Sequence, residues 1–234
     1  MPSWNIHLSI ANKINRKLKL DKNSFYLGNT LPDVDYGMKI TRKDTHFYNL
    51  KCDKCPNEFL PNVNEFFKLY KSKLYNPIIM GMYIHLLTDY YYNNEIFSKY
   101  WIQDENQNVI GIKLLNGKIK NFPPEDKNIR KKYKHCDLEL YGKYLFKNEN
   151  IYLPKFDENI LKNIKDLNII DYNEKILRSR IHYLNTEYIK KNKYTLVEKI
   201  FGLRYKMISK DDLDEMYYGC LEFIENNIKN LKFK

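Results

Sequence analysis

The chain has 234 residues, of which 15% are aromatic, and its 21 tyrosines exclude a disordered chain. Its formal net charge of +11 favours anionic partners such as phosphate esters, nucleic acid or an acidic membrane surface, although codon bias in an AT-rich genome enriches Lys, Asn, Ile and Tyr in the same way. No run approaches the roughly 18 apolar residues of a membrane span, and the N-terminus lacks a secretory signal, so we expect a cytoplasmic protein with no transmembrane segment.

The first third of the chain predicts one helix followed by two loops. Residues 3–18 have isoleucines at helical spacing, and Trp4 and His7 fall on one face of that helix. Residues 25–37 contain helix-breaking Gly and Pro and predict an ordered loop through the interior that presents Asp33 and Asp35. Residues 43–48 predict a polar loop that contains His46.

Cys52 and Cys55 form a C-x-x-C pair, which is the spacing of half a zinc knuckle, but no second half follows. The four cysteines are too few and too unevenly spaced for a disulfide framework, so we expect reduced thiols. We interpret this pair as two surface thiols, with a redox or zinc role as the lesser alternative. Residues 59–74 then predict an amphipathic helix.

A largely apolar and aromatic helix is predicted from Pro77 to about Tyr100, and it carries His85 and Asp89 four residues apart. At 3.6 residues per turn these two side chains share one face, about 6 Å apart along the axis. A carboxylate in so apolar a segment needs a partner or a metal. Two interpretations stay open for this pair: a metal site, or a core histidine bonded to an aspartate one turn away.

Residues 101–122 contain Asn-Gly between apolar runs and predict a small two-stranded hairpin. Helices are predicted over 127–146, 174–191 and 211–231. The first of these carries His135 and Glu139, a second pair at i,i+4 spacing, whereas His182 has no acid one turn on. No Gly/Ser/Pro-rich linker divides the chain, so we expect a single all-α domain over 1–234 with a small β-hairpin excursion.

The ordered set of polar residues resembles the zinc-dependent phospholipase C family. The set comprises His7 after Trp4, Asp33 in a Gly-x-x-x-Pro-Asp segment, His46 in His-Phe, and the pairs His85/Asp89 and His135/Glu139. The resemblance spans residues 4–139. It implies an all-helical fold that holds three zinc ions in a cleft, as in phospholipase C and the single-strand nucleases.

The resemblance also implies a set of metal ligands. One metal would be bound by Asp33, His46, His85 and Asp89, and Asp89 would bridge to a second metal held by His7. A third would be bound by His135, Glu139 and Glu95, which stands where the family has a histidine. The family's N-terminal Trp is also a ligand, but Trp4 here follows three other residues. We therefore expect two to three zinc ions, and the extra carboxylate allows Mn²⁺ or Fe²⁺.

The function that follows from the resemblance is metal-dependent hydrolysis of phosphate esters, with a metal-bridged water as nucleophile and with Asp33 and Asp89 as catalytic residues. The substrate would be a phospholipid, as in phospholipase C. A nuclease or nucleotide phosphodiesterase on the same fold is the nearest alternative. A hydrolase of the HD superfamily is excluded because the chain has no His-Asp doublet. A non-enzymatic basic helical binding module is the alternative from another class.

Overall fold

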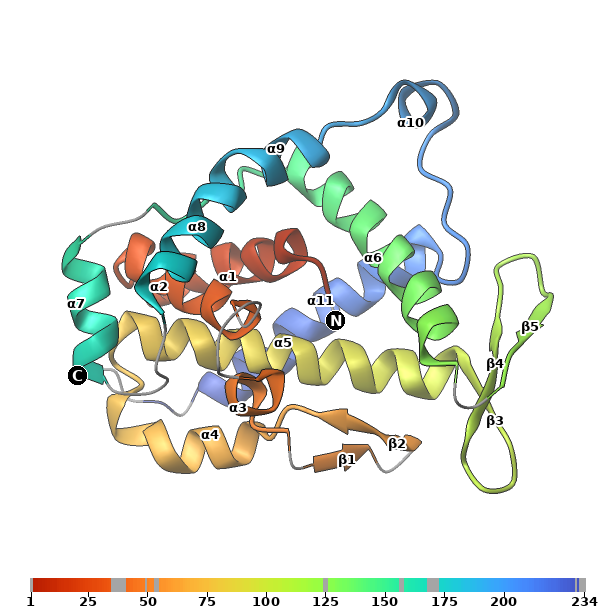
Figure 1. Ribbon diagram of the computed structural model, residues 1–234, viewed down its shortest axis with the longest axis horizontal. Coiled ribbons are helices and arrows are strands. Elements are labelled where there is room, and N and C mark those ends of the chain that lie inside the picture. Colours follow the sequence, from red (N-terminus) through yellow and green to blue (C-terminus); the bar gives the residue numbers. More distant parts are fainter. Residues whose placement is uncertain are drawn as a thin grey trace.

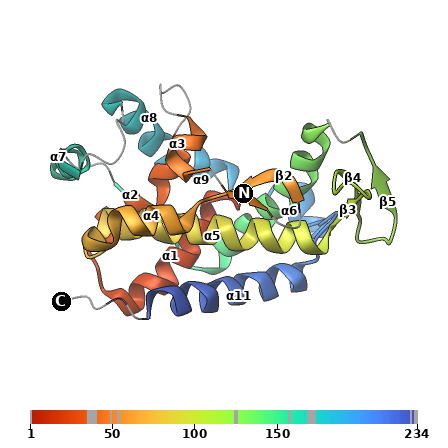
Figure 2. The same cartoon turned by 90° about the horizontal axis from the view of Figure 1, so that it is seen from below.

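The computed structural model describes residues 2–34, 41–48, 50–52, 55–123, 126–155, 158–167, 173–229 and 231. The described chain is predominantly helical, as the sequence predicts, and helix α5 (Pro77–Lys99) runs through the middle of the molecule (Figure 1). It contacts α1 (Trp4–Leu18), α2 (Lys22–Thr30), α4 (Val63–Tyr70) and α11 (Lys210–Ile228). A second view, from below, shows α11 alongside α5 and α4 near one end of it (Figure 2).

The remaining helical elements are all shorter than α5, and one of them, α6, packs on α1. They are η1 (Leu31–Asp33), α3 (Arg42–His46), η2 (Lys71–Lys73), α6 (Lys127–Asn148), α7 (Glu158–Leu167), α8 (Glu174–Asn185), α9 (Glu187–Lys191) and α10 (Leu196–Phe201).

Helix α5 begins where the sequence predicts, because Pro77 occupies its first turn and the Asn76 side chain accepts a hydrogen bond from the backbone N–H of Ile78. Every residue from Ile78 to Asp89 is buried. A helix that is apolar on all sides is covered by neighbours on all sides, and the two polar residues His85 and Asp89 are buried with the rest.

The prediction of a loop over residues 25–37 is wrong for its first part, because residues 22–30 form α2. Gly28 does not break this helix but lets it approach α5. A Cβ atom on Gly28 would lie 2.2 Å from the carbonyl oxygen of Ile78, and one on Gly81 would lie 2.1 Å from that of Phe25. Two facing glycines thus allow backbone-to-backbone contact between the helices. Asp35 and Gly37 lie outside the described residues.

A three-stranded antiparallel sheet follows α5, where the sequence predicts a two-stranded hairpin. It contains β3 (Trp101–Gln103), β4 (Val109–Lys113) and β5 (Ile119–Asn121). The predicted Asn-Gly turn connects β4 to β5, and Gly117 there has a φ of +78°. The extra strand, β3, continues directly from the end of α5.

A second, two-stranded sheet was not predicted. It consists of β1 (Leu50–Cys52) and β2 (Cys55–Leu60), which pair antiparallel with Cys52 opposite Cys55. The C-x-x-C pair therefore flanks a hairpin connection, and the predicted start of a helix at residue 59 is wrong, since α4 begins at Val63. The thiol groups of these two cysteines lie outside the described side chains.

Other elements also differ from the sequence prediction, and α6 and α11 end within three residues of the predicted ends. The segment expected as a polar loop at 43–48 contains α3, which Thr41 and Asp44 cap reciprocally. The helix expected at 174–191 is interrupted at Thr186, which separates α8 from α9. Helices α7 and α10 were not predicted.

One hydrophobic core contains side chains from α1 through to α11. Among the described residues, no helix is both long enough and apolar enough to cross a membrane.

Candidate metal centre

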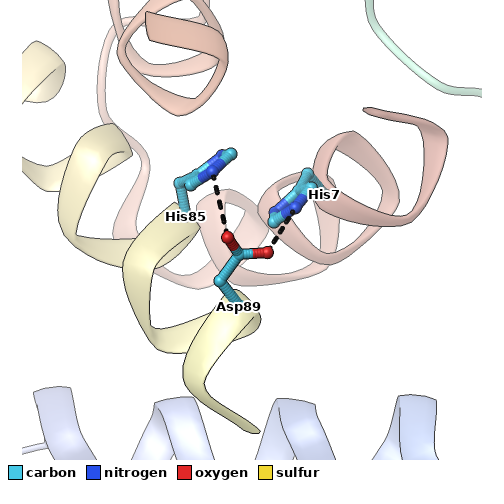
Figure 3. A group of neighbouring side chains, drawn as sticks. All are labelled: His7, His85 and Asp89. Atoms are coloured by element: carbon cyan, nitrogen blue, oxygen red, sulfur yellow. Dashed lines mark ion pairs between the residues drawn. The ribbon is translucent and has the colours of Figure 1, made fainter. Parts of the chain in front are cut away.

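Three buried side chains from α1 and α5 meet beside the middle of α5 (Figure 3). Asp89 Oδ1 lies 3.3 Å from His7 Nε2, and Asp89 Oδ2 lies 3.9 Å from His85 Nε2. The rings of His7 and His85 stack with their centroids 3.9 Å apart and their planes inclined by 6°. This group provides two imidazoles and a carboxylate with ligand atoms within 4.8 Å of one another.

A second group shares His85 with the first and adds Asp33 and His46. Asp33 Oδ1 lies 3.6 Å from His46 Nε2 and 3.8 Å from His85 Nε2. His46 Nε2 also lies 3.2 Å from Asp89 Oδ2. The two oxygens of Asp89 therefore face different groups: Oδ1 faces His7, and Oδ2 faces His46 and His85.

Hydrogen bonds to residues outside the two groups fix the orientation of His85 and Asp33. His85 Nδ1 lies 2.7 Å from the carbonyl oxygen of Asn29, and a carbonyl can only accept, so Nδ1 carries the proton. The lone pair of His85 Nε2 then points into the centre, where it faces Asp33 and Asp89. The indole N–H of Trp4 donates to Asp33 Oδ2 at 3.0 Å. These are the supporting contacts that orient metal ligands in proteins.

Arg42, which sequence reasoning missed, places a cation in the centre. Its Nη1 lies 2.9 Å from Asp33 Oδ1, and its Nη2 lies 3.3 Å from Asp89 Oδ2 and 2.6 Å from His46 Nε2. Since a guanidinium only donates, His46 Nε2 accepts here. The Thr41-x-x-Asp44 capping box is the sequence feature that could have revealed the contact between Arg42 and His46. It predicts a short helix on which these two residues share a face.

The charges in the centre depend on one another. Burial acts to raise the pKa of Asp33, but His85, Arg42 and His46 outweigh it and lower that pKa to about 2. The pKa of Asp89 is likewise held well below its usual range, against burial, by His46 and His7. Burial lowers the pKa of His85 to about 3. At neutral pH the centre thus contains two carboxylates, and His85 and His46 are neutral.

Unsatisfied atoms show that these residues fit a metal ion. Both ring nitrogens of His7 and the Oδ1 atom of Asp89 are buried, and no described group forms a hydrogen bond with them. Buried polar atoms without partners are rare in folded proteins and call for an explanation. Imidazole nitrogens and carboxylate oxygens are ligands that Zn²⁺ takes, and a cation bound between His7 and Asp89 would satisfy Asp89 Oδ1 and the Nε2 atom of His7.

The other predicted ligands lie apart from both groups. Among the described residues, neither group contains Glu95, His135 or Glu139. Lys99 Nζ lies 2.9 Å from Glu95 Oε2. His135 and Glu139, one turn apart on α6, instead line a pocket, and the prediction that these three residues bind a third metal stays a prediction.

That pocket has a volume of about 350 Å³ and adjoins the centre through Trp4. Besides His135 and Glu139, its lining includes Tyr183, Tyr188, Lys143 and Lys191. The Trp4 side chain both lines the pocket and donates to Asp33, so the two sites share a wall. The volume lies within the range of small-molecule sites in proteins.

One protein family, described as zinc dependent phospholipase C, has a model that matches residues 5–195. No curated protein and no solved structure matches the chain. The matched residues extend from α1 to the residue before α10 and include both groups of ligands. A match over this share of the sequence, together with the buried His/Asp centre, shows that the chain belongs to the zinc-dependent phospholipase C family.

Proposed function

We propose that this protein is a zinc-dependent hydrolase of phosphate esters that acts on phospholipids as a phospholipase C. The observation that carries the proposal is the buried pair of groups that share His85, with one oxygen of Asp89 facing each. Family membership supports the hydrolase class and zinc. The pocket beside Trp4 supports a small organic or lipid headgroup as the part of the substrate that is bound.

The residues that would hold the ions follow from their positions. Asp33, His46, His85 and Asp89 would hold one ion, and His7 with Asp89 would hold a second. We infer two sites here, and the third site expected at His135, Glu139 and Glu95 stays a prediction. When bound, zinc supplies Lewis acidity and a nucleophile available at neutral pH. Mn²⁺ or Fe²⁺ would serve the same ligand set.

Asp33 is suited to orient the attacking water as a charged hydrogen-bond acceptor. Its low pKa keeps it ionised at neutral pH, and Trp4 holds Oδ2 by a hydrogen bond at 3.0 Å. Arg42 is suited to neutralise the phosphate of the substrate, because its side chain is 29% exposed and a guanidinium matches two phosphate oxygens. Lys143 and Lys191 would attract the same charge at the pocket.

The proposal is tested by measuring the zinc content of the protein and the substrates that it hydrolyses. Plasma mass spectrometry of the purified protein should give two to three equivalents of zinc, and His85→Asn and Asp89→Asn should each lose zinc and phosphodiesterase activity together. His182→Asn is the matched control, since His182 is exposed and outside both groups.

A metal-free protein whose melting temperature does not respond to zinc would overturn the proposal in favour of a binding module. Zinc-dependent hydrolysis of a single-stranded oligonucleotide or a nucleotide, with none of phospholipid vesicles, would replace the lipid substrate with a nucleic-acid one.

A further inference from the structure

Helix α10 exposes an apolar face. Its four large apolar side chains are Leu196, Val197, Ile200 and Phe201, and they are 73%, 62%, 64% and 61% exposed. The helix lies at the tip of a segment that projects beyond α6 and α9 (Figure 1). Single exposed apolar residues are normal on a protein surface, but four on a six-residue helix form a patch that needs a partner.

The orientation of α10 is fixed by its polar side. At 100° per residue the four apolar side chains cover an arc of about 140°, with Glu198 outside it. Glu198 Oε1 lies 2.7 Å from Lys143 Nζ on α6, and its carboxylate also accepts the backbone N–H of Thr195 in a capping box. The one acidic side chain thus ties the helix to the body of the protein, and the apolar arc faces away from that tie.

Cations flank the apolar patch along the sequence. Lys193, Lys199, Arg204 and Lys206 are exposed, and the Arg204 guanidinium lies 5.1 Å from the centroid of the Phe201 ring. Glu198 is the only acidic residue from position 188 to position 210, and Lys143 neutralises it. Apolar side chains flanked by Lys and Arg are the pattern of segments that lie in the interface of an anionic bilayer.

We propose that α10 and its flanking cations dock the protein on anionic phospholipid bilayers. Leu196, Val197, Ile200 and Phe201 enter the interface, and the cations contact lipid phosphates. The face lies beyond the matched family residues, which end at 195. A bilayer suits this face better than a protein partner because the charges that flank it along the sequence are positive, apart from the paired Glu198, and the apolar side chains project from a tip.

Docking would also place the pocket close to lipid. Lys143, which holds α10 through Glu198, lines the pocket that contains His135 and Glu139. This consequence rests on the proposed phospholipase function, whereas bilayer binding itself does not. A segment that binds the bilayer at one edge of the pocket would raise the local concentration of lipid substrate there.

The test is sedimentation of the full chain with vesicles of phosphatidylcholine alone or with an equal part of phosphatidylserine. The wild type should bind the mixed vesicles, and the double variant Ile200→Asp/Phe201→Asp should bind them at least about tenfold more weakly. The control is Tyr75→Asp/Tyr218→Asp, which adds the same charge at side chains that are 66% and 67% exposed elsewhere. The control should bind like the wild type, and melting temperatures verify folding.

Equal binding by the wild type and the α10 variant, or no binding by either, would overturn the proposal. A wild-type dimer in light scattering without lipid, abolished in the α10 variant, would assign the patch to a second copy of the chain and also overturn it.

Hydrolysis assays separate this proposal from the proposed function. The α10 variant should keep full activity on a water-soluble phosphodiester and lose it on vesicles. If the wild type hydrolyses neither substrate yet binds vesicles, the proposed function fails and docking stands.

Discussion

Arg42 contacts the same atoms that a metal would bind: Asp33 Oδ1, Asp89 Oδ2 and His46 Nε2. A guanidinium and a metal ion at these atoms exclude each other. Arg42→Met should therefore bind zinc more tightly than the wild type, as measured by competition with a chelating dye. Without metal the variant leaves two buried carboxylates less compensated and should lose about 3 kcal/mol of stability, roughly 6 to 12 °C in melting temperature.

The matched control is Arg178→Met, which removes an exposed arginine paired with Glu158 and Glu174. Exposed pairs of this kind contribute about 1 kcal/mol or less. Unchanged zinc affinity together with an unchanged melting temperature in Arg42→Met would show that Arg42 does not occupy the centre.

His85 should make the metal-free protein sensitive to acid. Burial lowers its pKa from 6.5 to about 3, so between these values the unfolded chain binds a proton that the folded chain does not. Stability then falls as the pH falls below 6.5, by up to about 1.4 kcal/mol per pH unit. His46 acts in the same direction, since burial lowers its pKa too.

Denaturant unfolding of chelated protein between pH 6.5 and pH 4.5 would measure this effect. The slope of stability against pH should be shallower in His85→Gln and unchanged in a variant of the exposed His182, His182→Gln. An equal slope in all three proteins would show that His85 is accessible to protons in the folded state.

The residues of the centre were predictable in part. His85 and Asp89 share a helix, so their spacing alone places them together, and the family resemblance added His7, Asp33 and His46. Arg42 and the donation from Trp4 to Asp33 depend on where α1, α3 and η1 lie relative to one another. No spacing along the chain encodes those contacts.

At the scale of elements, the contact between α2 and α5 positions His85. Gly81 lies against the backbone of α2, and Asn29 on α2 supplies the carbonyl that orients the imidazole. Gly81→Ala would force a Cβ atom to within 2.1 Å of the Phe25 carbonyl oxygen, so the helices must separate. We expect a loss of about 3 kcal/mol and weaker zinc binding, measured by thermal unfolding and zinc titration.

Gly219→Ala is the control for that variant. The nearest atoms to its Cβ would be the hydroxyl and ring carbons of Tyr91, which belong to a side chain that can move, and alanine favours the helix by about 1 kcal/mol. A Gly81→Ala protein as stable as the wild type would contradict the close packing of α2 on α5.

Elements with strong local signals were predicted from the sequence, and elements that depend on distant contacts were not. Helix α5 has a cap, a proline at its start and a continuous apolar run, all of which are local signals. Helix α2 contains Gly28, which local rules assign to a break, and only the approach of α5 explains that glycine. Strands β1 and β2 are short, and their C-x-x-C connection resembles a metal-binding motif more than a turn.

For the whole molecule, the single core from α1 to α11 leads us to infer one domain, with the centre joining α1 to α5. Removing zinc should therefore lower the melting temperature of the entire protein. At a zinc concentration of about 1,000 times the dissociation constant, the bound ion adds about 4 kcal/mol. Calorimetry before and after chelation, and after zinc is restored, would measure this. Loss of bound zinc without a change in melting temperature would contradict it.

Trp4 gives the protein a built-in optical reporter. The chain has two tryptophans, Trp4 beside the centre and Trp101 on β3. In a Trp101→Phe variant the one indole left would be that of Trp4, whose N–H is bonded to Asp33, a predicted zinc ligand, and excitation beyond the absorption of tyrosine would select its emission. Metal loading changes the charge next to that indole, so its emission would follow the occupancy of the centre in real time, without a substrate, a dye or a label.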